Sequence, residues 1–312
     1  MPRSRWFHQR GLPFPGAKPV QSAYAMTPTV KAFFDKHSST LSYVVADPAS
    51  HRAAVVDPVL DYEARSGRTS TVLADQICDF VRDEGLAVDW ILETHVHADH
   101  LSAGGYLRDR LKNAKLAIGE HVTTVQSTWK DIYNLAPDFP VDGSQFDHHF
   151  CDGETFKVGD LSARVMHTPG HTPACITYVV EDRAWVGDTM FMPDYGTSRV
   201  DFPGGDAATL YRSIRRLFEL PAQTRLYMCH DYMPHDRPLA WETTVAEQRA
   251  NNVHIHDGVT EEAFVKLRTE RDKALPLPEL LLPAVQVNVR GGVLPEAEEN
   301  GTRYLKIPIN RF

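Results

Sequence analysis

The sequence predicts an α/β protein in which helices cover layered β-sheets. Short apolar runs typical of strands occur in two separate blocks of the chain, and segments with helical periodicity lie between and after them. The chain has 312 residues, of which 42% are apolar and 24% are charged. This length and composition are ordinary for a globular enzyme with a full hydrophobic core.

The first block predicts strand, strand, helix, strand, helix and strand, in that order. These elements span residues 41–47, 51–58, 66–86, 87–94, 101–113 and 114–119. A tight turn at Pro48–Ser50 joins the first two strands. The first helix is predicted because apolar residues recur at helical spacing and a Thr/Ser cluster can cap its start. These apolar residues are Val72, Ile77, Phe80 and Val81.

The second block predicts four strands, a helix, a further strand and two helices. The strands lie within 154–168, 174–191 and 224–230, and the helices lie at 206–220, near 240–251 and at 260–273. The segment 121–150 between the two blocks is rich in aromatic residues, and we expect an irregular flap there. Prolines recur in residues 275–312, which predicts an extended tail packed on the body of the protein.

We expect a single domain from residue 26 to residue 312, with this tail included. Residues 1–25 contain four basic residues and no acidic residue. That composition is compatible with a transit-type leader, but the segment has neither a clear amphipathic helix nor an apolar stretch. We therefore favour a flexible N-terminal extension over a leader.

The overall charge and the cysteines exclude several classes of protein. A formal net charge of −8 argues against nucleic acid as a main partner. No apolar run approaches the ~20 residues that a membrane-spanning helix needs. The cysteines show no CxxC spacing, which indicates a reducing compartment and, by default, the cytoplasm. They are Cys78, Cys151, Cys175 and Cys229.

Candidate metal ligands gather at four separate strand ends. They are His95, His97, Asp99 and His100 in ETHVHADH, His171 in TPGHTP, Asp188 in VGDTM, and His230 in MCHDY. Neutral imidazole and carboxylate groups are standard ligands of zinc and iron. Residues two apart in an extended segment point the same way, so His95 and His97 can face one point. Because strand ends meet at one edge of a layered fold, we expect a metal site there.

With these motifs the sequence resembles the metallo-β-lactamase superfamily. The motifs THVHADH, TPGHT, GDT and CHD occur in the superfamily's order within roughly residues 40–235. The resemblance implies an αββα sandwich with the metal at one edge. Since this superfamily catalyses many reactions, the fold alone does not decide the function.

Other segments resemble the persulfide dioxygenases, also called sulfur dioxygenases, and among them the β-lactamase-hydrolase-like proteins. These segments include FFDKHSSTLSYVVADP, GHTPACITYVV, GTSRVDFPGGDAATLYRSI and YLKIPIN, so the likeness covers nearly the whole chain from Met26 onward. The resemblance implies one Fe(II) per chain, held by His95, His171 and Asp188. The other matching positions would surround this site or bind a second metal, and they are His97, Asp99, His100 and His230.

The implied reaction converts glutathione persulfide, O₂ and water into glutathione and sulfite, which zinc cannot support because it has no redox step. Glutathione carries two carboxylates, so we expect basic and hydroxyl side chains around the mouth of the site. The candidates are Arg199, Tyr232, Arg249, Lys266 and Arg290. Each of them could instead form an ion pair, and for Arg199 we expect a salt bridge with Asp201 that shapes the site. The resemblance is also compatible with a homodimer.

A thioester hydrolase of the glyoxalase II type, with two zinc ions, is the alternative. All seven ligand positions are intact, so the ligand set alone leaves one metal and two metals open. In the hydrolase a metal-bound hydroxide would attack the thioester carbonyl. Only two short helices are predicted after His230, whereas glyoxalase II resembles a lactamase core followed by a larger helical domain. This difference favours the dioxygenase.

Overall fold

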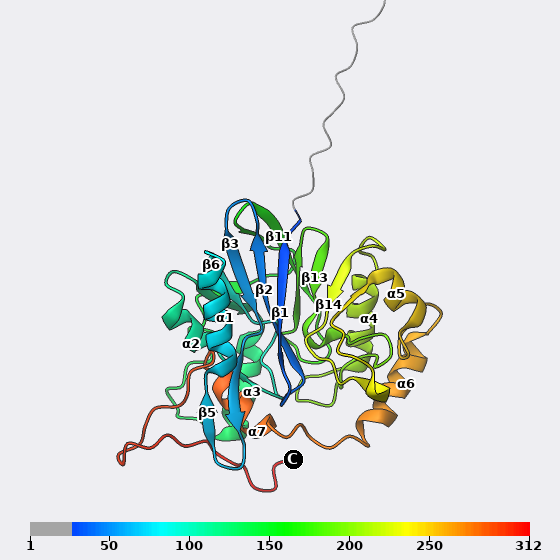
Figure 1. The fold of residues 1–312 in the computed structure, drawn as a ribbon. Coiled ribbons are helices and arrows are strands. Elements are labelled where there is room, and N and C mark those ends of the chain that lie inside the picture. Colours follow the sequence, from blue (N-terminus) through cyan, green and yellow to red (C-terminus); the bar gives the residue numbers. More distant parts are fainter. Residues whose placement is uncertain (1–26) are drawn as a thin grey trace, which may run out of the picture.

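Two six-stranded sheets form the centre of the protein, which is described by a computed structural model covering residues 27–312 (Figure 1). The first sheet contains, in spatial order, β1 (Thr29–Asp35), β2 (Thr40–Asp47), β3 (Arg52–Val56), β6 (Ala87–Leu92), β8 (Lys115–Gly119) and β9 (His148–Phe150). The second contains β10 (Thr155–Val158), β11 (Leu161–His167), β12 (Ile176–Val180), β13 (Arg183–Trp185), β14 (Arg225–Tyr227) and β15 (Glu242–Thr244). A small third sheet joins β5 (Arg68–Ser70), β4 (Val59–Glu63) and β7 (Leu101–Ser102).

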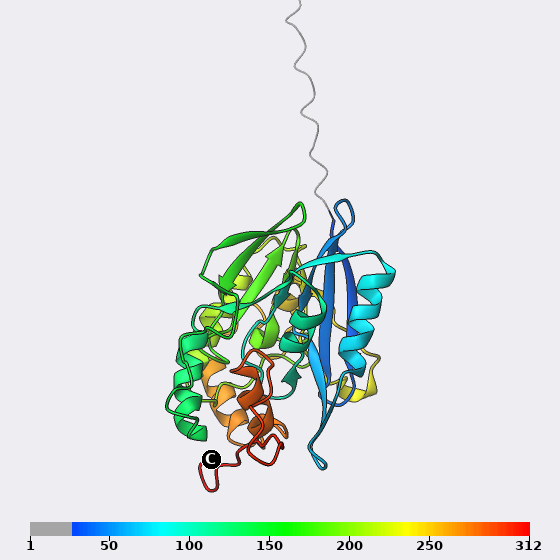
Figure 2. The same cartoon turned by 90° about the vertical axis from the view of Figure 1, so that its left-hand side faces the viewer.

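Helices cover the outer face of each large sheet (Figures 1 and 2). Those packed on the first sheet are α1 (Val72–Asp83), α2 (Gly104–Arg110), α3 (Val122–Tyr133) and α7 (Leu281–Asn288). Those packed on the second are α4 (Ala207–Leu217), α5 (Val245–Asn251) and α6 (Glu261–Asp272). Two short 3₁₀ turns, η1 (Gly187–Thr189) and η2 (Pro234–Asp236), follow β13 and β14. The predicted α/β class and the αββα sandwich are therefore confirmed.

Three apolar layers hold the sandwich together. The middle layer lies between the sheets, where Tyr43 and Val56 of the first sheet belong to the same buried cluster as Val165, Tyr178 and Trp185 of the second. Separate clusters bury the outer faces of the two sheets beneath their helices. Alternate residues of a strand point to opposite faces, so the central strands must be apolar on both faces. This requirement explains why every residue of β2 is buried.

The strand directions bring several strand ends to one edge of the sandwich. Strand β6 runs parallel to β3 and to β8, and β13 runs parallel to β14. Parallel neighbours end at the same edge of a sheet, and that edge is where open α/β folds bind their ligands. The segments after β6, β11, β13 and β14 contain the predicted metal ligands. The expectation that these ligands meet at one edge rests on this topology.

The expected irregular flap at 121–150 is wrong for its first half. Residues 122–133 form helix α3, which ends at Asn134 in a left-handed conformation with φ +46°. Its buried residues Val122, Val125, Trp129 and Tyr133 recur at helical spacing. Threonines and aromatic residues have weak helix propensity, so tertiary burial overrides the local preference here. Strand β9 near residue 150 also lies within the expected flap.

The expected extended tail at 275–312 is wrong for residues 281–288, which form helix α7. Pro283 is the third residue of this helix. A proline is tolerated there because the first N–H groups of a helix have no partner inside the helix. Most of α7 is buried in the layer that covers the first sheet. The C-terminal region is therefore part of the core as well as a covering segment.

The expected cap of helix α1 also differs in the structure. The Thr71 hydroxyl donates to Asp75 at 2.7 Å, and Leu73 N–H donates to the Asp61 carboxylate of β4 at 3.1 Å. Ile77 and Val81 are buried and Phe80 packs against the same cluster, as predicted, whereas Val72 is exposed and Leu73 is buried. The other predicted strands and helices form near their expected positions, and β1, β4, β5, β7 and β15 are additional. The predicted extension at 1–25 lies outside the described residues. Among residues 27–312, the structure contains no helix with the length and apolarity to cross a bilayer.

Candidate metal centre

The loop after β6 and the loops after β11, β13 and β14 meet at this edge of the sandwich. The seven predicted positions form two groups of possible metal ligands there, and Cys229 takes part in two further groups, one with Asp57 and His97 and one with Asp188 and His230. The first group joins His95, His171 and Asp188. The second group joins His97, Asp99, His100 and His230. Within each group the ligand atoms lie within 4.8 Å of one another, so the structure brings all seven predicted positions together.

In the first group, the ring nitrogens face one carboxylate oxygen. Asp188 Oδ2 lies 3.9 Å from His95 Nε2 and 3.7 Å from His171 Nε2. Metal–ligand bonds to these atom types are about 2.0–2.2 Å, so one ion can contact all three atoms. Burial lowers the pKa of His95 well below its usual value, which keeps the imidazole neutral. Burial alone would raise the pKa of Asp188, but His230 and, to a smaller extent, His95 and His171 hold this pKa below its ordinary value.

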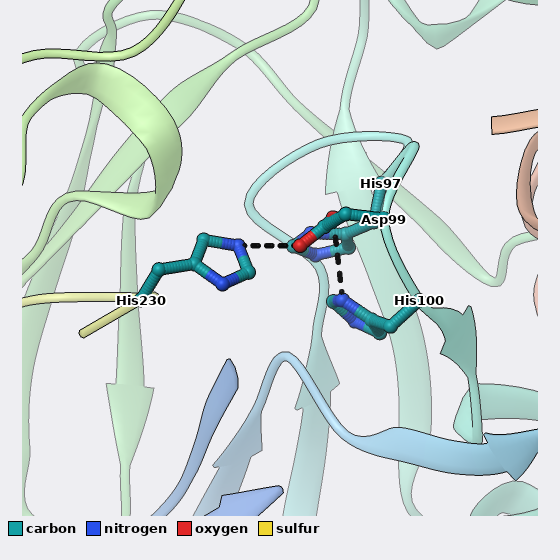
Figure 3. Close-up of side chains that lie close together, drawn as sticks. All are labelled: His97, Asp99, His100 and His230. Atoms are coloured by element: carbon teal, nitrogen blue, oxygen red, sulfur yellow. Dashed lines mark ion pairs between the residues drawn. The ribbon is translucent and has the colours of Figure 1, made fainter. Parts of the chain in front are cut away.

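In the second group, Asp99 lies between two histidines (Figure 3). One of its oxygens is 2.9 Å from His230 Nε2, and the other is 3.5 Å from His100 Nδ1. The Thr40 hydroxyl lies 3.3 Å from His230 Nδ1 and 3.4 Å from His100 Nδ1. His230 reaches the group from the segment after β14, whereas Asp99 and His100 come from the loop after β6 (Figure 3). The second group is therefore also connected internally by ion pairs.

Several buried nitrogen and oxygen atoms of these residues make no hydrogen bond, which fits residues that bind a metal. Buried side-chain atoms that make no hydrogen bond within residues 27–312 include His95 Nε2, His97 Nδ1, Asp99 Oδ2, His100 Nε2, Asp188 Oδ1 and His230 Nε2. Of these, Asp99 Oδ2 and Asp188 Oδ1 lie 2.9 Å and 3.2 Å from His230 Nε2 as ion pairs. A buried polar atom without a partner is costly, and most buried polar atoms in proteins have one. The atoms concentrate in the two groups, and imidazole nitrogens and carboxylate oxygens are ligands for zinc and iron. The donor set therefore fits a metal centre.

His95 and His97 were expected to face one point, and the structure separates them. Their rings lie 4.0 Å apart, but their free nitrogens belong to different groups. His97 Nε2 is instead 3.0 Å from Asp57 Oδ1 and 3.5 Å from Glu93 Oε2, both of which are buried. Burial lowers the pKa of His97, but these carboxylates outweigh burial and raise it to about 10. The carboxylates therefore fix the orientation of the ring.

Asp57 also supports the start of the loop after β6, called the ligand loop because it carries His95, His97, Asp99 and His100. Its carboxylate accepts hydrogen bonds from Thr94 N–H at 2.7 Å and from the Thr94 hydroxyl at 2.9 Å. The Thr94 hydroxyl in turn lies 3.1 Å from His95 Nδ1. Such partners hold a ligand ring in one orientation and leave its other nitrogen free for a metal.

Two glycines allow the other ligand segments to approach closely. Gly187, next to Asp188, has φ +51°, and a Cβ there would lie 2.5 Å from the Thr94 hydroxyl oxygen. Gly170, next to His171, has φ +139°, and a Cβ there would lie 2.4 Å from the backbone of Leu210 in α4. The glycines of the TPGHT and GDT motifs are thus required by packing against the ligand loop and a helix.

Helix α7 fastens the ligand loop from the opposite end of the chain. The side-chain amide of Asn288 donates to the carbonyls of His97 and His100, each at 2.8 Å. The Asn288 side-chain oxygen accepts from Ser102 N–H at 2.7 Å. Asn288 is buried. This residue was not predicted as part of the site, because no local sequence signal links it to a loop almost 190 positions away.

We expect Asn288→Ala to lower both stability and metal retention. The change leaves an N–H and two carbonyls without their partner, and each buried unpaired group costs about 1–3 kcal/mol. These costs do not add fully, so the free energy of unfolding should fall by about 2–5 kcal/mol. Urea denaturation and metal quantification after dialysis measure the two effects. The exposed Asn251→Ala provides the control, and equal stability of both variants would contradict the assigned role.

A cavity of about 380 Å³ opens onto the first ligand group. His171 and Asp188 lie at its wall, as does Asp99 of the second group. Phe191 and Phe202 contribute apolar lining. This volume lies in the usual range for pockets that bind small molecules. The cavity therefore gives a small substrate access to the first group mainly through His171 and Asp188.

Of the predicted substrate residues, Arg199 and Tyr232 line this cavity. Arg199 forms the expected salt bridge with Asp201, with contacts of 2.6 Å and 2.7 Å, and also donates to Pro276 O at 2.6 Å. Its carbonyl oxygen lies 2.8 Å from His171 Nδ1, which fixes the proton on that nitrogen and leaves Nε2 free. Tyr232 stacks on Tyr195, with ring centroids 4.6 Å apart.

The other three predicted substrate residues are not among those that line this cavity. Arg249 pairs with Asp257 at 2.9 Å, and the Arg290 guanidinium stacks over the ring of Phe139 at 4.6 Å. Lys266 lies on the outer side of α6, along a separate shallow depression. The basic character of these residues did not predict whether their side chains point toward the cavity, because a helix directs side chains away from a site as readily as toward it.

Cys175 is a buried residue of the segment before β12. Burial raises the pKa of its thiol to about 12, so it stays protonated near neutral pH. Only the thiolate is a good nucleophile. The residue therefore acts as a small apolar side chain.

The fold and the seven-residue site define a metal-dependent enzyme of one family. The chain belongs to the metallo-beta-lactamase superfamily, whose sequence profile matches residues 36–230. It is 51% identical to glyoxylase B2 from Dictyostelium discoideum, across 90% of this chain and 97% of that protein. It is 54% identical to a beta-lactamase hydrolase-like protein from Xylella fastidiosa, across 91% of this chain and 65% of the relative.

The chain is also similar to persulfide dioxygenases. It is 30% identical to the mitochondrial persulfide dioxygenase ETHE1 of Homo sapiens, across 85% of this chain and 89% of that protein. The crystal structure of ETHE1 from Myxococcus xanthus matches with a TM-score of 0.67 at 30% identity. That match covers 85% of this chain and 100% of the other. The resemblances stated from the motifs are thereby confirmed.

Proposed function

We propose that the protein is a persulfide dioxygenase that oxidises glutathione persulfide at a single Fe(II). The observation that carries the proposal is the group of two histidines and one carboxylate formed by His95, His171 and Asp188, of which His171 and Asp188 line the cavity. A two-histidine, one-carboxylate face with open positions is characteristic of non-haem Fe(II) oxygenases. The similarity to persulfide dioxygenase ETHE1 across 85% of the chain supports the same reaction.

The reaction balances as glutathione persulfide, O₂ and water giving glutathione, sulfite and two protons. The terminal sulfur is oxidised, O₂ is reduced, and the sulfur–sulfur bond breaks. Fe(II) held by His95, His171 and Asp188 would supply the redox step and open positions for sulfur and O₂. The protein's own residues position the reactants, which removes much of the entropic barrier.

The groups around the first ligand set hold it in a binding-competent form. Arg199 O accepts the Nδ1 proton of His171, and the Thr94 hydroxyl contacts His95 Nδ1. Both rings therefore present Nε2 toward Asp188. Phe202 packs edge-on against His171, with ring centroids 5.2 Å apart, and limits water at this wall. Such supporting contacts fix the ligand orientation and tune the metal.

A specific observation favours a second candidate, a dinuclear thioester hydrolase. The second ligand group has its own buried donor atoms without partners, including His97 Nδ1 and His100 Nε2. A second ion bound there could activate a water molecule for hydrolysis. The 51% identity to a protein named glyoxylase B2 points the same way. We prefer the dioxygenase because the similarity to persulfide dioxygenase ETHE1 covers 85% of the chain, and because the first group places both His171 and Asp188 at the cavity.

Oxygen uptake and metal content decide between the two candidates. We expect anaerobically purified, iron-loaded protein to bind one iron per chain and to consume one O₂ per glutathione persulfide. Sulfite should appear in equal amount, and S-lactoylglutathione should not be hydrolysed. Two zinc ions per chain together with thioester hydrolysis, and no oxygen uptake by the iron-loaded protein, would replace this proposal with the hydrolase.

A further inference from the structure

One wall of the cavity comes from the segment that joins α6 to α7. Leu275, Leu277 and Leu280 give this wall an apolar surface. Pro276 and Pro278 lie between the leucines, and proline restricts the backbone to extended conformations of this kind. Arg199 fixes the segment through its 2.6 Å hydrogen bond to Pro276 O. The wall is therefore held in place beside His171, whose Nδ1 contacts the carbonyl of the same arginine.

Two charged side chains of this wall have no partner. Arg271 precedes the leucines and Glu279 lies directly before Leu280, and both line the cavity. Both are exposed, and neither makes an ion pair or a side-chain hydrogen bond within residues 27–312. They do not pair with each other although they line the same cavity, so a ligand can enter between them.

The other arginines of the cavity already have carboxylate partners. Arg199 pairs with Asp201, and the buried Arg268 pairs with Asp272. Asp99 and Asp188 belong to the metal centre. In the described part of the chain, Arg271 and Glu279 are thus the arginine and carboxylate of this wall whose charges no protein group neutralises. A cation and an anion together fit a ligand group that carries both charges, rather than a simple anion.

We propose that Arg271 and Glu279 bind the zwitterionic amino-acid end of the thiol carrier, Arg271 its α-carboxylate and Glu279 its α-ammonium group. This inference rests on the proposed function, because that function places the sulfur of the carrier at His95, His171 and Asp188. The γ-glutamyl end of glutathione has both an α-carboxylate and an α-ammonium group. Hydrogen bonds between ionised groups are stronger than neutral ones and fix orientation. The two residues therefore select amino-acid thiols over thiols without this end.

Binding of S-methylglutathione tests the assignment without the redox reaction. We expect calorimetric titration of the metal-loaded protein to give a dissociation constant about tenfold higher for Arg271→Ala and several-fold higher for Glu279→Gln, as expected for the loss of one charged hydrogen bond. Exposed residues of the same region that do not line the cavity provide matched controls, Lys273→Ala and Glu270→Gln. Both controls should bind as the original protein does.

A modified ligand separates the two roles. Acetylation of the α-amino group of S-methylglutathione removes the ammonium, so Glu279→Gln should no longer weaken binding, whereas Arg271→Ala still should. Equal binding of all variants, or an effect of Glu279→Gln that survives acetylation, would overturn the assignment.

Kinetics distinguish failure of this inference from failure of the proposed function. With glutathione persulfide, both variants should raise KM by the same factors and leave kcat nearly unchanged, since the substituted groups lie away from the reacting sulfur. With the neutral persulfide of N-acetylcysteamine, their KM should equal that of the original protein. Oxygen uptake with unchanged KM in the variants overturns only the assignment of Arg271 and Glu279. Absence of oxygen uptake in the iron-loaded original protein overturns the proposed function itself.

Discussion

Replacing His171 with alanine is expected to remove the bound metal and to reduce persulfide oxidation by more than about 100-fold, since even changes in the partners of metal ligands cost 10–100-fold. His171 is part of the first group and lies at the wall of the cavity. Its loss leaves Asp188 and His95 as the remaining pair of that group. The measurements are iron per chain and the rate of oxygen uptake with glutathione persulfide.

The exposed His256→Ala tests whether the loss of any histidine has this effect. This control should keep its iron and its rate. Circular dichroism shows whether the His171 variant is folded, and Asp188→Asn provides a second change within the same group. A folded His171→Ala variant that keeps both iron and activity would remove this residue from the ligand set.

Replacing Arg268 with methionine should lower the free energy of unfolding by about 3–5 kcal/mol, the usual cost of removing one partner of a buried ion pair. The side chains of Arg268 and Asp272 are only 1% and 4% exposed. Arg268 also donates to Thr197 O at 3.1 Å, and Asp272 accepts from Val200 N–H at 2.9 Å. The variant leaves the Asp272 carboxylate buried without its cation, and denaturant unfolding measures the difference.

Arg212 provides the matched control on the neighbouring helix. It pairs with Glu261 of α6 at 3.1 Å, but the two side chains are 59% and 43% exposed. Exposed pairs contribute at most about 1 kcal/mol, so Arg212→Ala should have a small effect. If Arg268→Met were no more destabilising than Arg212→Ala, the burial of the Arg268 pair would not contribute to stability as argued.

Much of the sandwich could be predicted from the sequence because its strands are short apolar runs separated by turns. The run that forms β2 and the run that forms β6 are of this kind. The ligands could be predicted for a different reason. His95, His171 and Asp188 each follow a strand within a short motif, and the fold requires these strand ends to meet.

The remaining features depend on contacts between distant segments. Helix α3 has threonines and aromatic residues of weak helix propensity, and its burial against the first sheet stabilises it. Neither the place of Asn288 beneath the ligand loop nor that of Arg271 at the cavity wall follows from spacing. Conversely, Arg249 and Lys266 were predicted from their charge and from family-like positions in the C-terminal part, yet Arg249 pairs with Asp257 and Lys266 lines a separate depression.

The hydrogen bonds of Asn288 also bear on how this protein can be divided. The family profile ends at residue 230, whereas Asn288, whose side chain binds the ligand loop, belongs to α7. A protein shortened to the end of the profile would contain all seven histidines and aspartates of the metal centre. It would lack Asn288, which holds the loop that carries four of them. Replacing or removing residues 231–312 should therefore alter metal uptake, even though that part contains none of the seven candidate ligands.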